Sequence, residues 1–188
     1  MKLCFIDLET TGTDPAKNGI LQVSGIIRVP RMENVSTEYT FNLRIRPFPT
    51  DEIENEALKS NGLDPNVGFT PREAHTELLK VLGRYVDKYN KRDKLFFVGY
   101  NAKFDYDFLR RFFDKLHDKY FGSWFFAPAL DVMSLALQEL IEKRSAMENF
   151  KLATVCRTMG IEFDLEKAHG AEYDIAKTAE LYDKLVNS

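Results

Sequence analysis

Alternating apolar and polar residues mark the first strands of this chain. Residues 3–9 form an apolar run that ends in acids, residues 19–29 are rich in Ile and Val, and residues 39–45 alternate apolar with polar side chains. Patterns of this kind predict β-strands. With a hairpin loop expected over residues 30–36, the three consecutive strands indicate an antiparallel meander.

Helical periodicity dominates the rest of the chain. It predicts a short helix over residues 52–60 and a longer one over residues 71–90, with Pro71 in the first turn. The apolar run over residues 94–100 predicts a buried strand, and a helix is expected over residues 103–117. A short strand over residues 126–130, a helix capped by Asp131, and helices over residues 151–159 and at the C-terminal end complete the pattern. This alternation predicts an α/β fold.

Length and composition fit one globular domain. The chain has 188 residues and is 44% hydrophobic, which allows a substantial core, so we expect a single domain over residues 1–188. Its formal net charge of −3 is no sign of a nucleic-acid partner, although local patches rather than net charge steer such ligands.

Cysteine usage and hydropathy bear on location. Cys4 and Cys156 both fall within apolar patterns, which favours core packing over a disulfide. The few apolar residues before Asp7 are too few for a signal peptide, and no run reaches membrane-spanning length. We therefore expect a cytoplasmic protein with no membrane partner.

Two acids stand at the end of the first strand. Strand alternation places Asp7 and Glu9 on the same face as Leu3 and Phe5, which begins as a buried face. The simplest interpretation is a strand that runs out into solvent. Buried acids are costly without a compensating cation, so a metal site is the alternative.

Two further acids occur near the starts of predicted helices. Asp105 and Asp174 each precede, at helical spacing, residues that form the inward stripe of their helix. A helix cap is the structural alternative for Asp105, but Asn101 is the better-placed cap and Asp105 is expected at least one turn inside.

The four acids together favour a metal site. Asp7, Glu9, Asp105 and Asp174 all fall at the ends of strands or the starts of helices, where open α/β sheets place their sites. Oxygen ligands alone select hard cations, so the expected cofactors are two Mg²⁺ or Mn²⁺ ions, about 3.5–4 Å apart as in two-metal phosphoryl-transfer sites. Asp7 is expected to bridge both ions, and Glu9 to hold one nearer the mouth.

Three motifs resemble those of a known family. Asp7-Leu8-Glu9-Thr10-Thr11-Gly12, Asn101-Ala102-Lys103-Phe104-Asp105 and His169-Gly170-Ala171-Glu172-Tyr173-Asp174 are similar, in order and spacing, to the three motifs of the DEDDh subclass of DnaQ-like 3′-to-5′ exonucleases. The resemblance extends over residues 3–185. The sister subclass has a tyrosine four residues before the last Asp, but Gly170 stands there, so the histidine subclass matches better.

The resemblance implies a fold, an activity and a set of roles. The fold would be ribonuclease H-like, with a central mixed sheet of about five strands flanked by helices. The four acids would hold two divalent metals and His169 would be the general base. We expect release of nucleoside 5′-monophosphates from a free 3′ end, with DNA ranked first and RNA trimming as the alternative. A DNA polymerase or another replication or repair complex is a candidate partner.

Residues next to the motif acids are candidates for substrate contacts. Thr10, Thr11 and Gly12 follow the first acidic pair directly, and Phe104 adjoins Asp105, so these residues could hold the terminal nucleotide by hydrogen bonds and stacking. Core packing is the alternative for Phe104.

Two readings from other classes stay open. One is a nucleic-acid-binding module that keeps the fold without the activity. The other is a phosphorelay receiver domain, which also gathers acids around Mg²⁺. The early meander and the His169 motif argue against the receiver.

Overall fold

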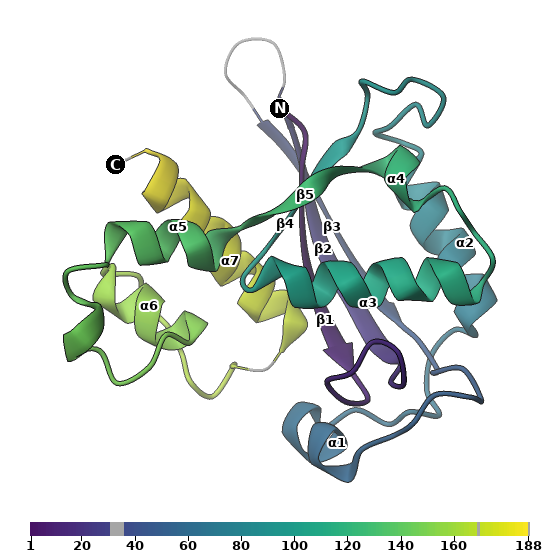
Figure 1. The fold of residues 1–188 in the computed structure, drawn as a ribbon, viewed down its shortest axis with the longest axis horizontal. Helices are drawn as coiled ribbons and strands as arrows, with labels where there is room; N and C mark the ends of the chain where they lie inside the picture. Colours follow the sequence, from purple (N-terminus) through teal and green to yellow (C-terminus); the bar gives the residue numbers. More distant parts are fainter. Residues whose placement is uncertain (31–35, 169, 188) are drawn as a thin grey trace.

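The computed structural model describes residues 1–30, 36–168 and 170–187, and Figure 1 shows their arrangement. The strands are β1 (Leu3–Thr10), β2 (Ile20–Pro30), β3 (Ser36–Arg44), β4 (Leu95–Gly99) and β5 (Phe125–Asp131). The helices are α1 (Asn55–Asn61), α2 (Pro71–Leu82), α3 (Ala102–Lys115), α4 (Phe121–Trp124), α5 (Val132–Glu139), α6 (Leu152–Thr158) and α7 (Ala171–Val186), with a 3₁₀ turn at Arg144–Ala146.

The strands form one mixed sheet in the order β3-β2-β1-β4-β5. The pairs β1–β2 and β2–β3 are antiparallel, whereas β1–β4 and β4–β5 are parallel. The antiparallel meander and the parallel second half expected from the sequence are therefore both confirmed, and the fold is ribonuclease H-like. As the central strand, β1 has neighbours on both sides.

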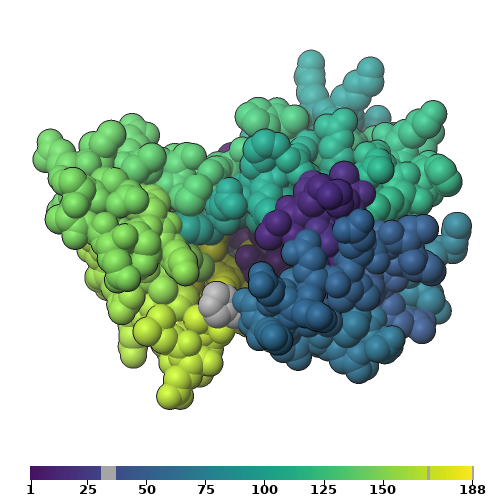
Figure 2. Space-filling model, turned by 60° about the horizontal axis from the view of Figure 1, so that its bottom comes forward, coloured from purple at the N-terminus to yellow at the C-terminus, as the bar shows by residue number. Residues whose placement is uncertain are grey.

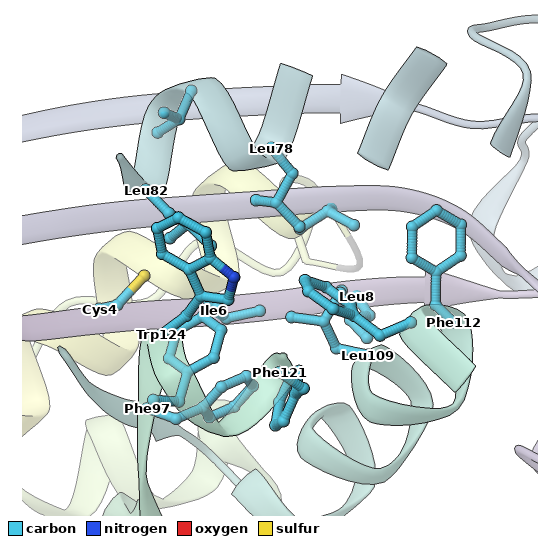
Figure 3. Packing of buried hydrophobic residues seen from close by; sticks show 14 of the residues in the cluster. Cys4, Ile6, Leu8, Leu78, Leu82, Phe97, Leu109, Phe112, Phe121 and Trp124 are labelled. Carbon is cyan, nitrogen blue, oxygen red and sulfur yellow. The ribbon is translucent and has the colours of Figure 1, made fainter. Parts of the chain in front are cut away.

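Helices cover both faces of the sheet. In Figure 1, α2 and α3 lie on one side of the strands and α5, α6 and α7 on the other. Because strand side chains alternate, β1 supplies both cores: Cys4, Ile6 and Leu8 pack against α2 and α3, while Leu3 and Phe5 pack against α5, α6 and α7. Figure 3 shows the first of these cores.

The second core lies on the face that carries the first pair of acids. Asp7 and Glu9 continue the alternation of Leu3 and Phe5, so they point toward the α7 side of the sheet. Cys156 on α6 is fully buried in this core, as expected, and Cys4 is fully buried in the other. Both cysteines are free thiols.

The structure corrects several boundaries expected from the sequence. α2 ends at Leu82 rather than near residue 90, because Gly83 takes the C-cap position and the chain then turns. Val86 is buried beyond the helix, which explains why the apolar spacing continued. The four-residue helix α4 had no periodicity to reveal it. The expected hairpin loop over residues 30–36 falls mostly outside the described residues.

The cap of α2 offers a test of local stability. The Thr70 hydroxyl accepts a hydrogen bond from the Glu73 amide, and the Glu73 carboxylate accepts one from the Thr70 amide. Thr70→Ala should lower the free energy of unfolding by about 1 kcal/mol, because it leaves a helix amide without its partner. Urea denaturation measures this. Thr76→Ala, which removes a hydroxyl from the same helix without touching its cap, is the control and should change stability by less. Equal losses in both variants would contradict the prediction.

Candidate active site

Asp7 and Glu9 lie at the C-terminal end of the central strand. In the antiparallel register Asp7 pairs with Ser24 and Glu9 with Gln22, so these four side chains share one face of the sheet. The register shifts directly after Glu9, where Thr10 pairs with Ile20. Such irregularities bend a strand and are common beside active sites.

Asp105 reaches the same end of the sheet from α3. It lies in the first turn of the helix rather than one turn inside, and it is buried, with 4% of its surface exposed. Its Oδ1 accepts a hydrogen bond from the Leu8 backbone amide at 3.1 Å. This bond places the Asp105 carboxylate between the positions of Asp7 and Glu9 along β1.

The carboxylates at this end of the sheet influence one another's pKa values. Burial raises the pKa of Asp7 well above its usual range, and the charges of Asp105, Glu9 and Asp174 raise it further. Burial and the charge of Asp174 raise the pKa of Glu9 to about 7. Burial also raises the pKa of Asp105, although the hydrogen bond from Leu8 opposes the shift. Ionising this cluster therefore costs free energy unless positive charge compensates it.

Asp174 completes the cluster from α7. It lies in the first turn of that helix and is half-buried. Its neighbour Tyr173 has a structural role, since the Tyr173 hydroxyl accepts a hydrogen bond from the Asp164 amide and its ring packs against Phe163. His169, the expected general base, lies outside the described residues, so its role stays a prediction.

The donor chemistry of this cluster fits hard divalent cations. Four carboxylates supply only oxygen ligands, the set that Mg²⁺ and Mn²⁺ prefer. Among residues 1–30, 36–168 and 170–187, no three His, Cys, Asp or Glu side chains are arranged to hold a metal ion. The metal assignment therefore rests on the shared location and mutual repulsion of the carboxylates, and it stays a prediction.

The segment after β1 is fixed by its own hydrogen bonds. The hydroxyl of Thr11 is fully buried, donates to the Glu52 carbonyl at 2.6 Å and accepts from the Gly19 amide at 2.8 Å. The hydroxyl of Thr10 donates to the Gly12 carbonyl at 2.7 Å. Both hydroxyls are thus engaged within the protein, so their expected contacts with substrate stay untested.

Two asparagines that the sequence analysis did not single out support this segment. Asn61, at the end of α1, donates from its side chain to the Thr10 carbonyl at 3.1 Å. The amide of buried Asn18 donates to the Glu52 carbonyl at 3.0 Å. Asparagines in turn-rich segments carry no pattern that marks such long-range contacts. Phe104, the fourth candidate for substrate contact, is half-buried, and its ring lies 4.8 Å from that of Phe108.

A row of polar side chains crosses the sheet beside the acids. The sequence patterns did not predict this row either. Gln22 donates to the side chains of Asn42, at 2.8 Å, and Ser24, at 3.3 Å, and Asn42 donates to the Glu172 carboxylate at 2.5 Å. Gln22 and Ser24 interrupt the apolar run of β2 at alternate positions. This interruption is the feature of the sequence from which the polar row could have been predicted. A cavity of about 330 Å³ lies over this row, between β2, β3 and the start of α7.

The molecular surface is hollowed near the C-terminal half of the chain and α1. Figure 2 looks onto the lower end of Figure 1 and shows a depression between the yellow-green C-terminal segments and the blue segment that contains α1. The purple of β1 lies at its floor. A concave surface at the end of the central strand is the expected place for a site in this architecture.

This arrangement of sheet and acids defines a class of nucleases, and comparison with known proteins agrees. The sequence profile of the family described as "Exonuclease" matches residues 4–182. The chain therefore belongs to this exonuclease family, and it is a 3′-to-5′ exonuclease of the DnaQ-like class.

Among individual proteins, the chain is similar in sequence to ribonuclease T from several bacteria. The chain is 31% identical over 187 residues to ribonuclease T from Baumannia cicadellinicola subsp. Homalodisca coagulata, a match that covers 97% of this chain and 82% of the relative. It is 28% identical over 187 residues to ribonuclease T of Escherichia coli (strain K12), covering 97% and 83%. Neither relative is named as a polymerase subunit, so the polymerase partner stays without support.

A solved structure shares the fold. E. coli exonuclease I in complex with a dT13 oligonucleotide superimposes with a TM-score of 0.75 at 20% identity. The match covers 100% of this chain but 41% of that one, so the chain spans about two fifths of the exonuclease I length. Among the described residues, no helix is long and apolar enough to cross a bilayer. The cytoplasmic location stays a prediction.

Asp7 offers a test of the crowded carboxylates. In a chelator at neutral pH, Asp7→Asn should raise the free energy of unfolding by about 1 kcal/mol or more, because it removes an acid whose charged form is disfavoured by desolvation and by the neighbouring acids. Nuclease activity should fall by about a hundredfold or more. Urea denaturation and a nuclease assay measure the two effects. Asp107→Asn, an acid-to-amide change at an ion pair with Lys103, should alter stability by less than about 0.5 kcal/mol. A destabilised Asp7→Asn protein would refute the argument.

Gly12 offers a test of the segment after β1. A Cβ at Gly12 would come within 2.2 Å of Glu54 Oε1 and 2.4 Å of the buried Asn18 Nδ2. Gly12→Ala should therefore lower the free energy of unfolding by about 1–3 kcal/mol. The control is Gly122→Ala, because a Cβ at Gly122 meets no described atom within 4 Å. Thermal or urea unfolding of both variants measures the difference, and equal stabilities would contradict the close packing at Gly12.

Proposed function

We propose that this exonuclease removes nucleotides from the 3′ end of single-stranded RNA. The observation that carries the proposal is the joining of Asp7, Glu9, Asp105 and Asp174 in one mutually repelling cluster at the end of β1. The ribonuclease T relatives, matched over 97% of this chain, support RNA as the polymer.

In the proposed reaction each residue of the cluster has a role. The four carboxylates would hold two divalent cations, Mg²⁺ or Mn²⁺. When bound, these cations lower the pKa of the attacking water and offset negative charge at the leaving 3′-oxygen. His169 accepts the proton of the water, since an imidazole titrates near neutral pH. The products are a nucleoside 5′-monophosphate and a shortened strand with a new 3′-hydroxyl.

The residues around the cluster position the end of the strand. Phe104 adjoins Asp105, and although it packs against Phe108 and the core it is only half-buried, so we assign it stacking on the terminal base. Because the Thr10 and Thr11 hydroxyls are engaged within the protein, we assign substrate contacts of this segment to its backbone groups. At Gly12 a Cβ would meet Glu54 and Asn18, so the glycine is required by the packing within this segment and leaves only its backbone groups for substrate.

RNA replaces DNA as the first candidate for a specific reason. Exonuclease I, whose structure carries a DNA oligonucleotide, is 20% identical to this chain, and a likeness at that level concerns the fold. The ribonuclease T sequences are more similar and are covered over 82–83% of their own length. DNA, the first expectation from the sequence, is retained as the second candidate.

A matched pair of substrates tests the proposal. The enzyme should shorten a 5′-labelled single-stranded RNA in Mg²⁺ or Mn²⁺ at least about tenfold faster than DNA of the same sequence, because reading a 2′-hydroxyl discriminates by a few kcal/mol. Initial rates on a sequencing gel measure the difference, with Asp7→Asn as the inactive control. Equal or faster cleavage of DNA would overturn the choice of RNA.

Two further substrates test the reaction itself. A strand with a 3′-phosphate should be shortened much more slowly than the same strand with a 3′-hydroxyl, and the released product should be the 5′-monophosphate. A protein that binds strands without shortening them would support the non-catalytic binding module instead. The receiver alternative is already excluded by the exonuclease family profile, which matches residues 4–182.

A further inference from the structure

Asp131 joins two helices and two strands beside the candidate active site. Its Oδ1 accepts hydrogen bonds from the amides of Met133 at 3.1 Å, Asn101 at 2.9 Å and Ala102 at 3.3 Å. Its Oδ2 accepts one from the Ser134 hydroxyl at 3.0 Å. The bonds to Met133 and Ser134 are the cap of α5 that the sequence predicts. The bonds to Asn101 and Ala102 are additional and lead to α3.

The start of α3 depends on this second pair of bonds. Asn101 occupies the N-cap position, but its side chain makes no capping hydrogen bond with any described residue. Its backbone is in the left-handed region, with φ 62° and ψ 45°, which Asn tolerates better than most other residues with a side chain. Asn101 is thus the N-cap residue, as expected, but its side chain does not cap the helix. The Asp131 carboxylate instead binds the amides of Asn101 and of the first helical residue, Ala102.

The first turn of α3 leads directly to a candidate metal ligand. Asp105 follows Ala102 by three residues, which is within one turn of the helix. The Asp105 carboxylate then binds the amide of Leu8, the neighbour of Asp7. A continuous path of hydrogen bonds and one helical turn thus runs from the end of β5, across the end of β4, to the cluster on β1.

We propose that Asp131 is a positioning residue for the exonuclease reaction. It holds the first turn of α3 so that the Asp105 carboxylate stays beside Asp7 and Glu9 on β1, where the cations and the substrate would bind. The proposal rests on the function proposed above. It assigns Asp131 no contact with substrate or cation. Supporting residues of this kind commonly affect cation affinity and activity together, because they fix the orientation of the ligand.

Two substitutions separate this role from that of a cap for α5. Asn and Ser are both good N-caps, so D131N and D131S should each keep α5 capped. The Asn side chain has the length of Asp and keeps its Oδ1 acceptor for the amides of Asn101 and Ala102. The Ser side chain is too short to reach them. D131N is therefore the conservative rescue and D131S the test variant.

The main measurement is cation binding, independent of turnover. Titration of Mn²⁺ into the protein, followed by electron paramagnetic resonance, should show affinity lowered by about 10–100-fold in D131S and nearly unchanged in D131N. The rate on single-stranded RNA at subsaturating Mn²⁺ should follow the same order. Hydrogen exchange of the Leu8 amide should accelerate in D131S, because its acceptor on Asp105 is no longer held in place.

Each outcome decides the proposal. Equal Mn²⁺ affinity in wild type and D131S, with only the melting temperature lowered, would show a purely structural cap and overturn it. Loss of affinity in both D131S and D131N would assign the effect to charge and also overturn it. If D131S does not fold, D131T takes its place, because Thr is an equally short cap. A wild-type protein without nuclease activity would instead refute the function on which the proposal rests.

Discussion

The hydrogen bond from the Leu8 amide to Asp105 is the contact on which the site depends. It joins the central strand to α3 at the point where both deliver a carboxylate, and it lies in a buried environment. Burial and the charges of three neighbouring acids raise the pKa of Asp7, which is next to Leu8. A fold that brings these groups together acts against their repulsion. The two hydrophobic cores on either side of β1 provide the free energy that offsets it.

Much of this arrangement could be predicted from local patterns. Strand alternation is sufficient to place Asp7 and Glu9 on one face, and helical spacing is sufficient to place Asp105 and Asp174 on inward stripes. The position of α1 beside the end of β1 could not be predicted, because it depends on contacts between residues far apart in the sequence, such as Asn61 with Thr10.

The sequence-based predictions that failed did so because of tertiary contacts of this kind. Val86 continues the apolar spacing of α2 although the helix has ended, because burial and helical continuity both select apolar residues. Asn101 has the side chain of a good cap, yet a carboxylate from β5 satisfies the helix amides instead. The Thr11 hydroxyl makes its hydrogen bonds to the backbone of Glu52 and Gly19, so it is not available to a substrate. In each case a tertiary contact outcompetes a local preference, and a single sequence does not display that competition.

The four site carboxylates account for the sign of the net charge of the chain. Without the four site carboxylates, the formal net charge of −3 becomes +1, so the remainder of the protein is close to neutral. Net charge outside the site therefore gives little repulsion of an anionic strand. Under the proposed function, divalent cations cancel the repulsion from the site carboxylates at the position where the scissile phosphate must lie. Binding of the cations and binding of the strand are then coupled through the same four carboxylates, and the precision with which Asp105 is held affects both.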